Sequence, residues 1–117
     1  MTRSHVNTVV LVGRLAEDPA RRPLAAGGEV VSWRLIVDRP GSGDGRHVVD
    51  ALACCTFEPG VGGRTATWRK GDLIQVRGSL RRRFWGVDEV RRSRHEVEVY
   101  EAAQLFEEQA GSPRGPD

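Results

Sequence analysis

Cysteine, lysine and aromatic residues are all scarce in this sequence, and the two cysteines, Cys54 and Cys55, are adjacent. Because successive side chains of a strand point to opposite faces, this pair is poorly placed to form a disulfide, and we expect buried free thiols. The spacing of cysteine and histidine matches no common zinc motif, so we expect neither a metal site nor a cofactor. At 117 residues the chain has the length of a single domain that folds without such cross-links.

Long apolar runs and catalytic motifs are missing from the sequence as well. No stretch approaches the 18 apolar residues of a membrane helix, and the apolar run at 9–12 is too short for a secretory signal. We therefore expect a cytoplasmic protein with no membrane partner. The glycines near Lys70 do not form a phosphate-binding loop, which needs Ser or Thr directly after Gly-Lys. Since no nucleophile elbow or paired acid and base is present, we expect no enzyme activity.

The positive charge is almost entirely arginine, and it is unevenly distributed. Seventeen arginines accompany one lysine, and the formal net charge of +2 combines +7 over residues 1–94 with −5 over residues 95–117. Guanidinium groups bind phosphates and stack on flat rings. This composition favours a nucleic acid as the partner over a surface of mixed charge that only keeps the protein in solution.

Alternating apolar residues predict five strands, over 5–15, 29–38, 47–57, 72–85 and 95–105, with a short helix over 64–70 that Gly71 ends. The glycine-rich loop at 39–45 is expected to be mobile. Three strands, a helix and two strands is the order of the OB-fold, an all-β, five-stranded Greek-key barrel that binds oligonucleotides. We assign residues 1–108 to this domain and residues 109–117, which have no apolar period, to a disordered tail.

The candidate binding residues concentrate on the hairpin around 77–94. Its first strand is predicted to turn Ile74, Val76, Gly78 and Leu80 inward and its arginines outward. Single-stranded nucleic acid presents phosphates and exposed base faces, so a surface that binds it needs cations beside flat rings. Residues 81–94 hold six arginines against two acids, Asp88 and Glu89. The predicted DNA-binding residues are Trp85 for stacking, with Arg34, His47, Arg77, Arg81, Arg83, Arg91 and Arg92.

The other two tryptophans are predicted to be structural. Trp33 lies in an apolar run beside Leu35 and is assigned to the core, and Trp68 is placed on the helix, plugging one end of the barrel.

Residues 6 to about 106 resemble the bacterial single-stranded DNA-binding proteins. The family's opening, Asn-x-Val-x-Leu-Val-Gly-x-Leu, is similar to residues 7–15, Asn-Thr-Val-Val-Leu-Val-Gly-Arg-Leu. The similarity continues at Asp18-Pro19, Arg22, 28–30, 69–71 and 78–85. It implies a homotetramer of OB-folds that binds single-stranded DNA in replication, recombination or repair. It also implies that Arg81 and Arg83 contact phosphates and that Trp85 stacks on a base.

Three departures from the family pattern suggest a diverged paralogue. Val49 stands where the family commonly has a Trp, and Cys55 stands where a stacking Phe is expected. The glycine-rich loop at 41–45 also lacks an aromatic residue where one is expected. The sequence ends Arg-Gly-Pro-Asp instead of in an acidic tip with Pro-Phe, so recruitment of repair proteins through the tail is not expected. Two alternatives stay open: an interaction subunit that binds DNA weakly or not at all, and an RNA-binding OB domain, because stacking and phosphate contacts do not distinguish the sugar.

Overall fold

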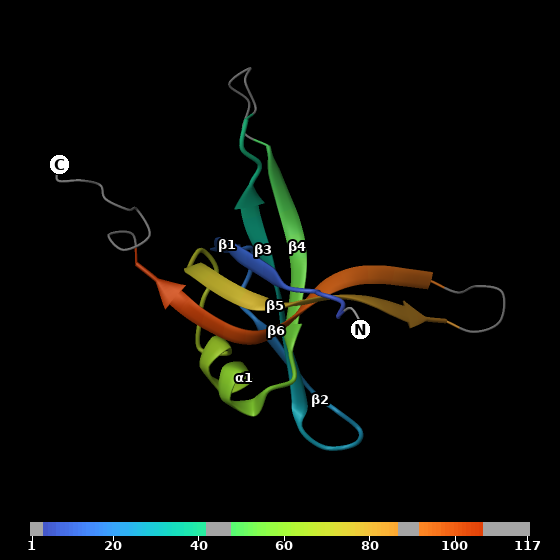
Figure 1. Cartoon of the computed structure of the whole chain (residues 1–117). Coiled ribbons are helices and arrows are strands. Elements are labelled where there is room, and N and C mark those ends of the chain that lie inside the picture. The colour runs from blue at the N-terminus through green and yellow to red at the C-terminus, as the bar shows by residue number, and fades with distance from the viewer. Residues whose placement is uncertain (1–3, 42–47, 87–91, 107–117) are drawn as a thin grey trace.

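The computed structural model describes residues 4–41, 48–86 and 92–106. Its strands form one sheet in the order β1-β5-β6-β4-β3-β2, and β1 returns to pair with β3 at Arg14 and Leu15, which closes a barrel of five strands. Two long hairpins, β3–β4 and β5–β6, extend from this barrel as arms (Figure 1). The elements are β1 (Val9–Leu15), β2 (Ala20–Pro23), β3 (Glu29–Asp38), β4 (Val49–Thr56), α1 (Pro59–Thr65), β5 (Leu73–Trp85) and β6 (Arg92–Leu105).

The predicted all-β barrel with one short helix between its third and fourth strands is therefore confirmed. Strand β3 has the predicted bounds, and β5 begins one residue later than predicted. Strand β2 was not predicted, because its four residues are all exposed and so carry no alternation of apolar and polar side chains. It pairs with the outer edge of β3, where Arg21 Nη2 lies 2.6 Å from Glu29 Oε2.

The position of the helix was predicted wrongly. Helix α1 spans Pro59–Thr65, not 64–70, because Pro59 begins the helix instead of only ending the strand before it. A proline is tolerated in the first helical turn, where its missing N–H has no intrahelical partner to lose. Gly71 has a φ of +92°, but it belongs to a later turn in which the Asp72 N–H donates to the Arg69 carbonyl at 3.0 Å.

The barrel interior confirms most of the predicted core. Trp33 is buried there, and Trp68 is also buried, although it follows α1 instead of lying on it. Val97 and Val99 point inward as predicted. Both cysteines are buried free thiols, as expected.

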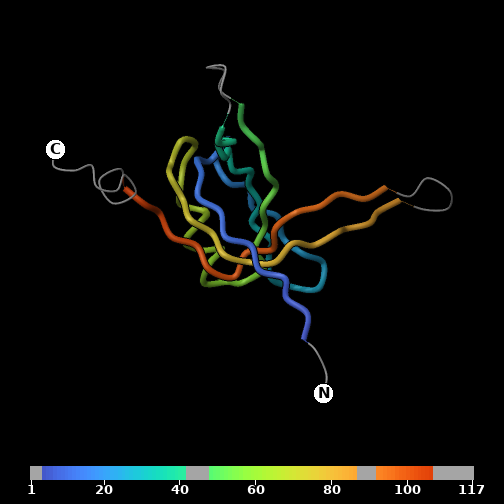
Figure 2. Tube along the Cα trace, turned by 45° about the horizontal axis from the view of Figure 1, so that its top comes forward, coloured from blue at the N-terminus to red at the C-terminus, as the bar shows by residue number. Residues whose placement is uncertain are grey.

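Leu80 is an exception to the predicted pattern of β5. Ile74, Val76 and Gly78 are buried as predicted, but Leu80 is half-exposed. Figure 2 shows that β5 and β6 leave the barrel together as an arm, and Leu80 lies where this arm begins.

The arm leaves the barrel next to an irregularity in the β5–β6 pairing. Arg77 lies opposite Glu101 but Gly78 lies opposite Val99, so Tyr100 is an extra residue on β6. Such a bulge bends a strand and increases its twist. Gly78 also has a tight backbone neighbour, because a Cβ built on it would overlap the carbonyl oxygen of Glu98.

Several expectations fall outside the described residues. The predicted mobile loop at 39–45 does so for the most part, and the predicted tail at 109–117 does so entirely. Within the part of the chain that the structure describes, no helix has the length and apolarity needed to cross a membrane.

We predict that Gly78→Ala lowers the free energy of unfolding by about 3 kcal/mol, because the added methyl group overpacks against backbone that cannot move aside. Urea denaturation measures this loss. The control is Gly63→Ala in α1, where an added Cβ meets nothing within 4 Å. That change should stabilise the protein by up to about 1 kcal/mol through helix propensity. Equal effects of the two substitutions would contradict the role of Gly78.

Candidate nucleic-acid interface

A groove with a volume of about 450 Å³ runs over the outer surface between β2–β3 and the β5–β6 arm. Its walls combine apolar side chains with arginines, and a carboxylate lies among them. The residues that line it include Arg22, Ser32, Cys55, Phe57, Arg83, Phe84, Trp85, Arg94 and Glu96.

Three aromatic rings line this groove and are exposed. The exposed fractions are 40% for Phe57, 50% for Phe84 and 48% for Trp85. Each ring has a guanidinium beside it: Arg83 lies 5.6 Å from the Phe57 centroid, Arg94 lies 5.8 Å from Trp85, and Arg82 lies 4.9 Å from Phe84. Each of these rings therefore has a cation beside it, and stacked bases with their phosphates require flat rings and cations together.

Phe57 is a candidate residue that the sequence analysis missed. Cys55 stands where the family resemblance implied a stacking Phe, and it is buried in the structure. Phe57 stands two residues further along and lines the same groove, so the aromatic surface is less reduced than the sequence suggested. The sequence offered one signal for it: Phe57 stands directly before Glu58-Pro59, in the short connection between β4 and α1.

Two arginines of the arm, Arg81 and Arg83, are paired with carboxylates on β6. The Arg83 Nε donates to Glu96 Oε2 at 2.7 Å, and its Nη2 donates to Glu98 Oε1 at 3.0 Å. The same Glu98 oxygen accepts from the Arg81 Nε at 3.1 Å. The two acids counted in the sequence, Asp88 and Glu89, belong to residues 81–94, whereas β6 runs from Arg92 to Leu105 and brings Glu96 and Glu98 across from the arginines.

Glu96 lines the groove and holds this network together, and it is only 8% exposed. Burial by itself would raise the pKa of Glu96, but hydrogen bonds from Arg83 and Cys55 outweigh it and hold the pKa below its ordinary value. The bond to Glu96 in turn raises the pKa of Arg83. Arg94 Nη2 adds a third contact at 3.4 Å.

The two thiols are protonated at neutral pH. Burial raises the pKa of Cys54 to about 12, and burial together with the neighbouring Glu96 raises that of Cys55 to about 11. A thiol with so high a pKa is a poor nucleophile and a poor metal ligand. Among the described residues, no three histidine, cysteine or acidic side chains gather as a metal site would require.

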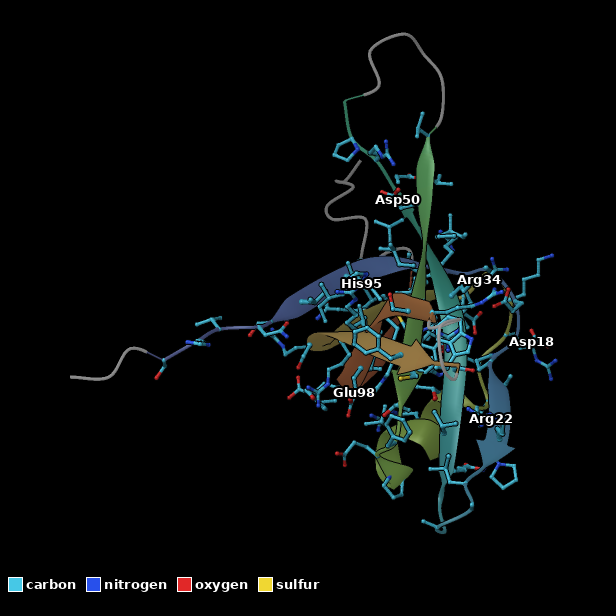
Figure 3. The ribbon with its side chains drawn as sticks, turned by 90° about the vertical axis from the view of Figure 1, so that its right-hand side faces the viewer. Asp18, Arg22, Arg34, Asp50, His95 and Glu98 are labelled. Carbon is cyan, nitrogen blue, oxygen red and sulfur yellow. The ribbon has the colours of Figure 1, made fainter. Side chains whose placement is uncertain are left out.

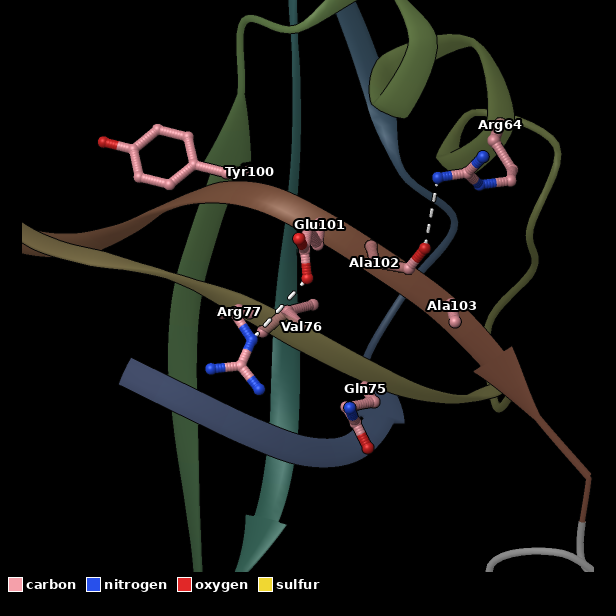
Figure 4. A pocket seen from close by; sticks show the side chains of 8 residues that line it. All are labelled: Arg64, Gln75, Val76, Arg77, Tyr100, Glu101, Ala102 and Ala103. Atoms are coloured by element: carbon pink, nitrogen blue, oxygen red, sulfur yellow. Dashed lines mark hydrogen bonds and ion pairs between the residues drawn. The ribbon is translucent and has the colours of Figure 1, made fainter. Parts of the chain in front are cut away.

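Arg77 is not brought together with the other predicted site residues. It lies on the barrel side of the bulge, in a separate pocket near Arg64 and Tyr100 (Figure 4). Its Nε is 3.6 Å from Glu101 Oε1, while Arg64 Nη2 donates to the Ala102 carbonyl at 3.3 Å.

The remaining predicted residues are spread over the arm and β3. Arg92 lies opposite Trp85 on the arm. Arg34 points outward from β3, near Asp18 in Figure 3, and its Nη2 lies 2.7 Å from Glu17 Oε1. This hydrogen-bonded pair lowers the pKa of Glu17. His47 and Arg91 lie outside the described residues.

We predict that Glu96→Gln lowers the free energy of unfolding by about 1–3 kcal/mol at neutral pH, because Arg83 and Arg94 lose a buried anionic partner. The folded-state pKa of Glu96 is depressed, so its contribution is present above the unfolded-state pKa and is lost as the pH falls through the folded-state value. The difference between variant and wild type should therefore shrink in acid. Urea titrations at neutral and acidic pH measure it, with the exposed Glu101→Gln as control. A difference that does not depend on pH would contradict this account.

Comparison with known proteins identifies a family and several relatives of this chain. Residues 6–105 match the model of the single-strand binding protein family. The chain is 31% identical over 111 residues to single-stranded DNA-binding protein 3 of Listeria innocua, covering 94% of this chain and 69% of that protein. It is 31% identical over 111 residues to the single-stranded DNA-binding protein of Halalkalibacterium halodurans, covering 94% and 66%. The chain thus spans about two thirds of the length of these relatives.

A solved structure shares the fold. The Plasmodium falciparum SSB complex with ssDNA matches with a TM-score of 0.77 at 19% sequence identity, covering 91% of this chain and 100% of that chain. The family match also agrees with the expectation that the chain is not an enzyme. The matched residues run from just before β1 to the end of β6, so the whole barrel and both its arms lie within them. This chain therefore belongs to the single-strand binding protein family.

Proposed function

We propose that this protein binds single-stranded DNA, with little preference for sequence, in the groove between β2–β3 and the β5–β6 arm. The observation that carries the proposal is that exposed rings and guanidinium groups line that groove together, with Arg83 beside Phe57 and Arg94 beside Trp85. Every base has a flat face, so stacking on a ring tolerates any sequence, while arginines bind the phosphates between the bases. The names of the relatives support the same ligand.

Within this proposal the rings and the cations have different roles. Trp85 and Phe57 stack on bases, since both are half-exposed and line the groove. Arg81, Arg83 and Arg92 on the arm contact phosphates, and Arg22 does so from β2. Two further predicted DNA-binding arginines, Arg34 and Arg77, lie outside the groove. Single-stranded DNA reaches them only if it continues around the barrel. A role in replication, recombination or repair is proposed from family membership, and the cytoplasmic location stays a prediction.

We further propose that the protein assembles as a homotetramer, as the family resemblance implies. Strand β1 offers a surface for pairing between copies. Along its length it pairs with β5, but in the described residues its backbone pairing with β3 is limited to Arg14 and Leu15. Val10 and Val12 on this strand are also exposed. An unpaired strand edge with apolar side chains is a common site of association between chains.

We expect light scattering to give about four times the chain mass of 12.9 kDa. A monomer at micromolar concentration would contradict the assembly but not the binding groove, since all the groove residues come from one chain.

The binding proposal is tested by titrating a fluorescently labelled oligo-dT and following its anisotropy. Trp85→Ala and Phe57→Ala should each weaken binding by roughly 5- to 150-fold, since stacking on one base contributes about 1–3 kcal/mol. Phe106→Ala removes an exposed ring outside the groove lining and should leave the affinity unchanged.

Matched titrations with oligo-dA and oligo-dC should show the same loss for Trp85→Ala, whereas a loss confined to one base would argue against stacking. An RNA of the same length, tested at two salt concentrations, distinguishes a DNA binder from an RNA-binding domain. If no nucleic acid binds, the alternative of an interaction subunit is favoured.

A further inference from the structure

The carboxylate of Glu98 is hydrogen-bonded to Arg81 and Arg83, two arginines that the proposed function assigns to DNA phosphates. One oxygen of Glu98 accepts hydrogen bonds from both Arg81 and Arg83, at 3.1 and 3.0 Å. An oxygen held between two arginines is also how a phosphate oxygen binds in such a site. The arginines are half-exposed and Glu98 is 17% exposed, so a nucleic acid strand can reach the same donors.

Glu98 differs in its surroundings from the neighbouring Glu96. Glu96 is buried, and it holds the thiol of Cys55 as well as Arg83, so it is part of the barrel structure. The hydrogen bonds and ion pairs of Glu98, in contrast, all go to Arg81 and Arg83 within the described part of the chain. Its charge can therefore be removed without orphaning a buried group, because Arg83 keeps Glu96 as its partner.

A phosphate that binds Arg81 and Arg83 meets the negative charge of Glu98 at the same place. Either the DNA phosphate displaces the Glu98 carboxylate from the two guanidinium groups, or the phosphate and the carboxylate lie side by side and repel each other. In both cases part of the attraction between arginine and phosphate is lost. Fewer counterions are also released from the DNA than the number of arginines suggests, which weakens the dependence of binding on salt.

We propose that Glu98 is an affinity-limiting residue of the interface, which competes with DNA phosphate for Arg81 and Arg83. This proposal rests on the proposed function, since it concerns how strongly the arm holds single-stranded DNA: Arg83 lines the groove, and Glu98 links it to Arg81 just outside the groove lining. Because Glu98 weakens the contacts between arginine and phosphate, stacking on Trp85 and Phe57 supplies the larger part of the binding free energy.

The test is Glu98→Gln, which keeps an oxygen that accepts the hydrogen bonds but removes the charge. We expect its affinity for labelled oligo-dT to rise by about threefold to fivefold at low salt, the range of an exposed ion pair. The log-log salt slope should become more negative by up to about 0.7, the value for one further phosphate contact on a single strand. Glu101→Gln is the matched control, because it removes the same charge from the same strand but from an acid that pairs with Arg77 instead. It should change the affinity by less than about twofold.

A second comparison separates a local competition from a change in overall charge. In an Arg81→Gln background, the gain from Glu98→Gln should fall, because one of the two contested guanidinium groups is gone. If Glu98→Gln does not fold, as judged by thermal melting, Glu98→Asp withdraws the carboxylate by one methylene group and should give a smaller gain.

The outcomes separate this proposal from the proposed function. Wild type that binds and a Glu98→Gln variant that binds equally or more weakly would overturn the role of Glu98 and leave the binding groove intact. Equal gains from Glu98→Gln and Glu101→Gln would overturn it too. Binding by Glu98→Gln alone would support it in its strongest form. If neither wild type nor variant binds, the proposed function itself fails.

Discussion

The close approach of β5 and β6 at Gly78 is the constraint on which the rest of the molecule depends. The carbonyl of Glu98 occupies the space that any side chain at position 78 would need, so the two backbones can be this close only at a glycine. Around this point the two strands complete the barrel, with Ile74 and Val99 in the core and with β6 pairing β4 at Val97 and Glu98. Beyond it they leave the barrel as an arm, and the bulge at Tyr100 lies beside the place where they part.

The arm explains how so small a barrel presents a broad surface. A strand within the barrel exposes one face only, but on the arm Leu80, Phe84 and Trp85 of β5 are all half-exposed, although Glu96 opposite Arg81 is still buried. Phe84 and Trp85 are consecutive, so they point to opposite faces of β5, and yet both are exposed and both line the groove. Phe57 reaches the same groove from the end of β4, next to Arg83. The aromatic surface is therefore assembled from two parts of the chain that the barrel brings together.

The charge of the molecule is organised by the same pairing. By position in the sequence, the acidic residues 95–117 follow a basic body, as if the chain had two separate regions. In the structure Glu96 and Glu98 belong to β6, and the hairpin folds them back onto Arg81 and Arg83. The arginines of the arm are thus partly neutralised and firmly positioned, and the net charge of a segment is a poor measure of the charge that it offers to a partner.

Periodicity along the chain was enough to predict the five barrel strands, the buried Trp33 and the outward arginines of β5, because alternation between a core and solvent is a local property. The sequence also sufficed for the family, whose pattern lies in consecutive residues such as 7–15. It did not predict β2, whose exposed residues carry no alternation, or the start of α1 at Pro59. The pairing of Glu98 with Arg81 and the grouping of Phe57 with Trp85 were decided by the tertiary structure alone. Both join residues that are far apart in the chain, and they depend on cross-strand register, which local pattern leaves open.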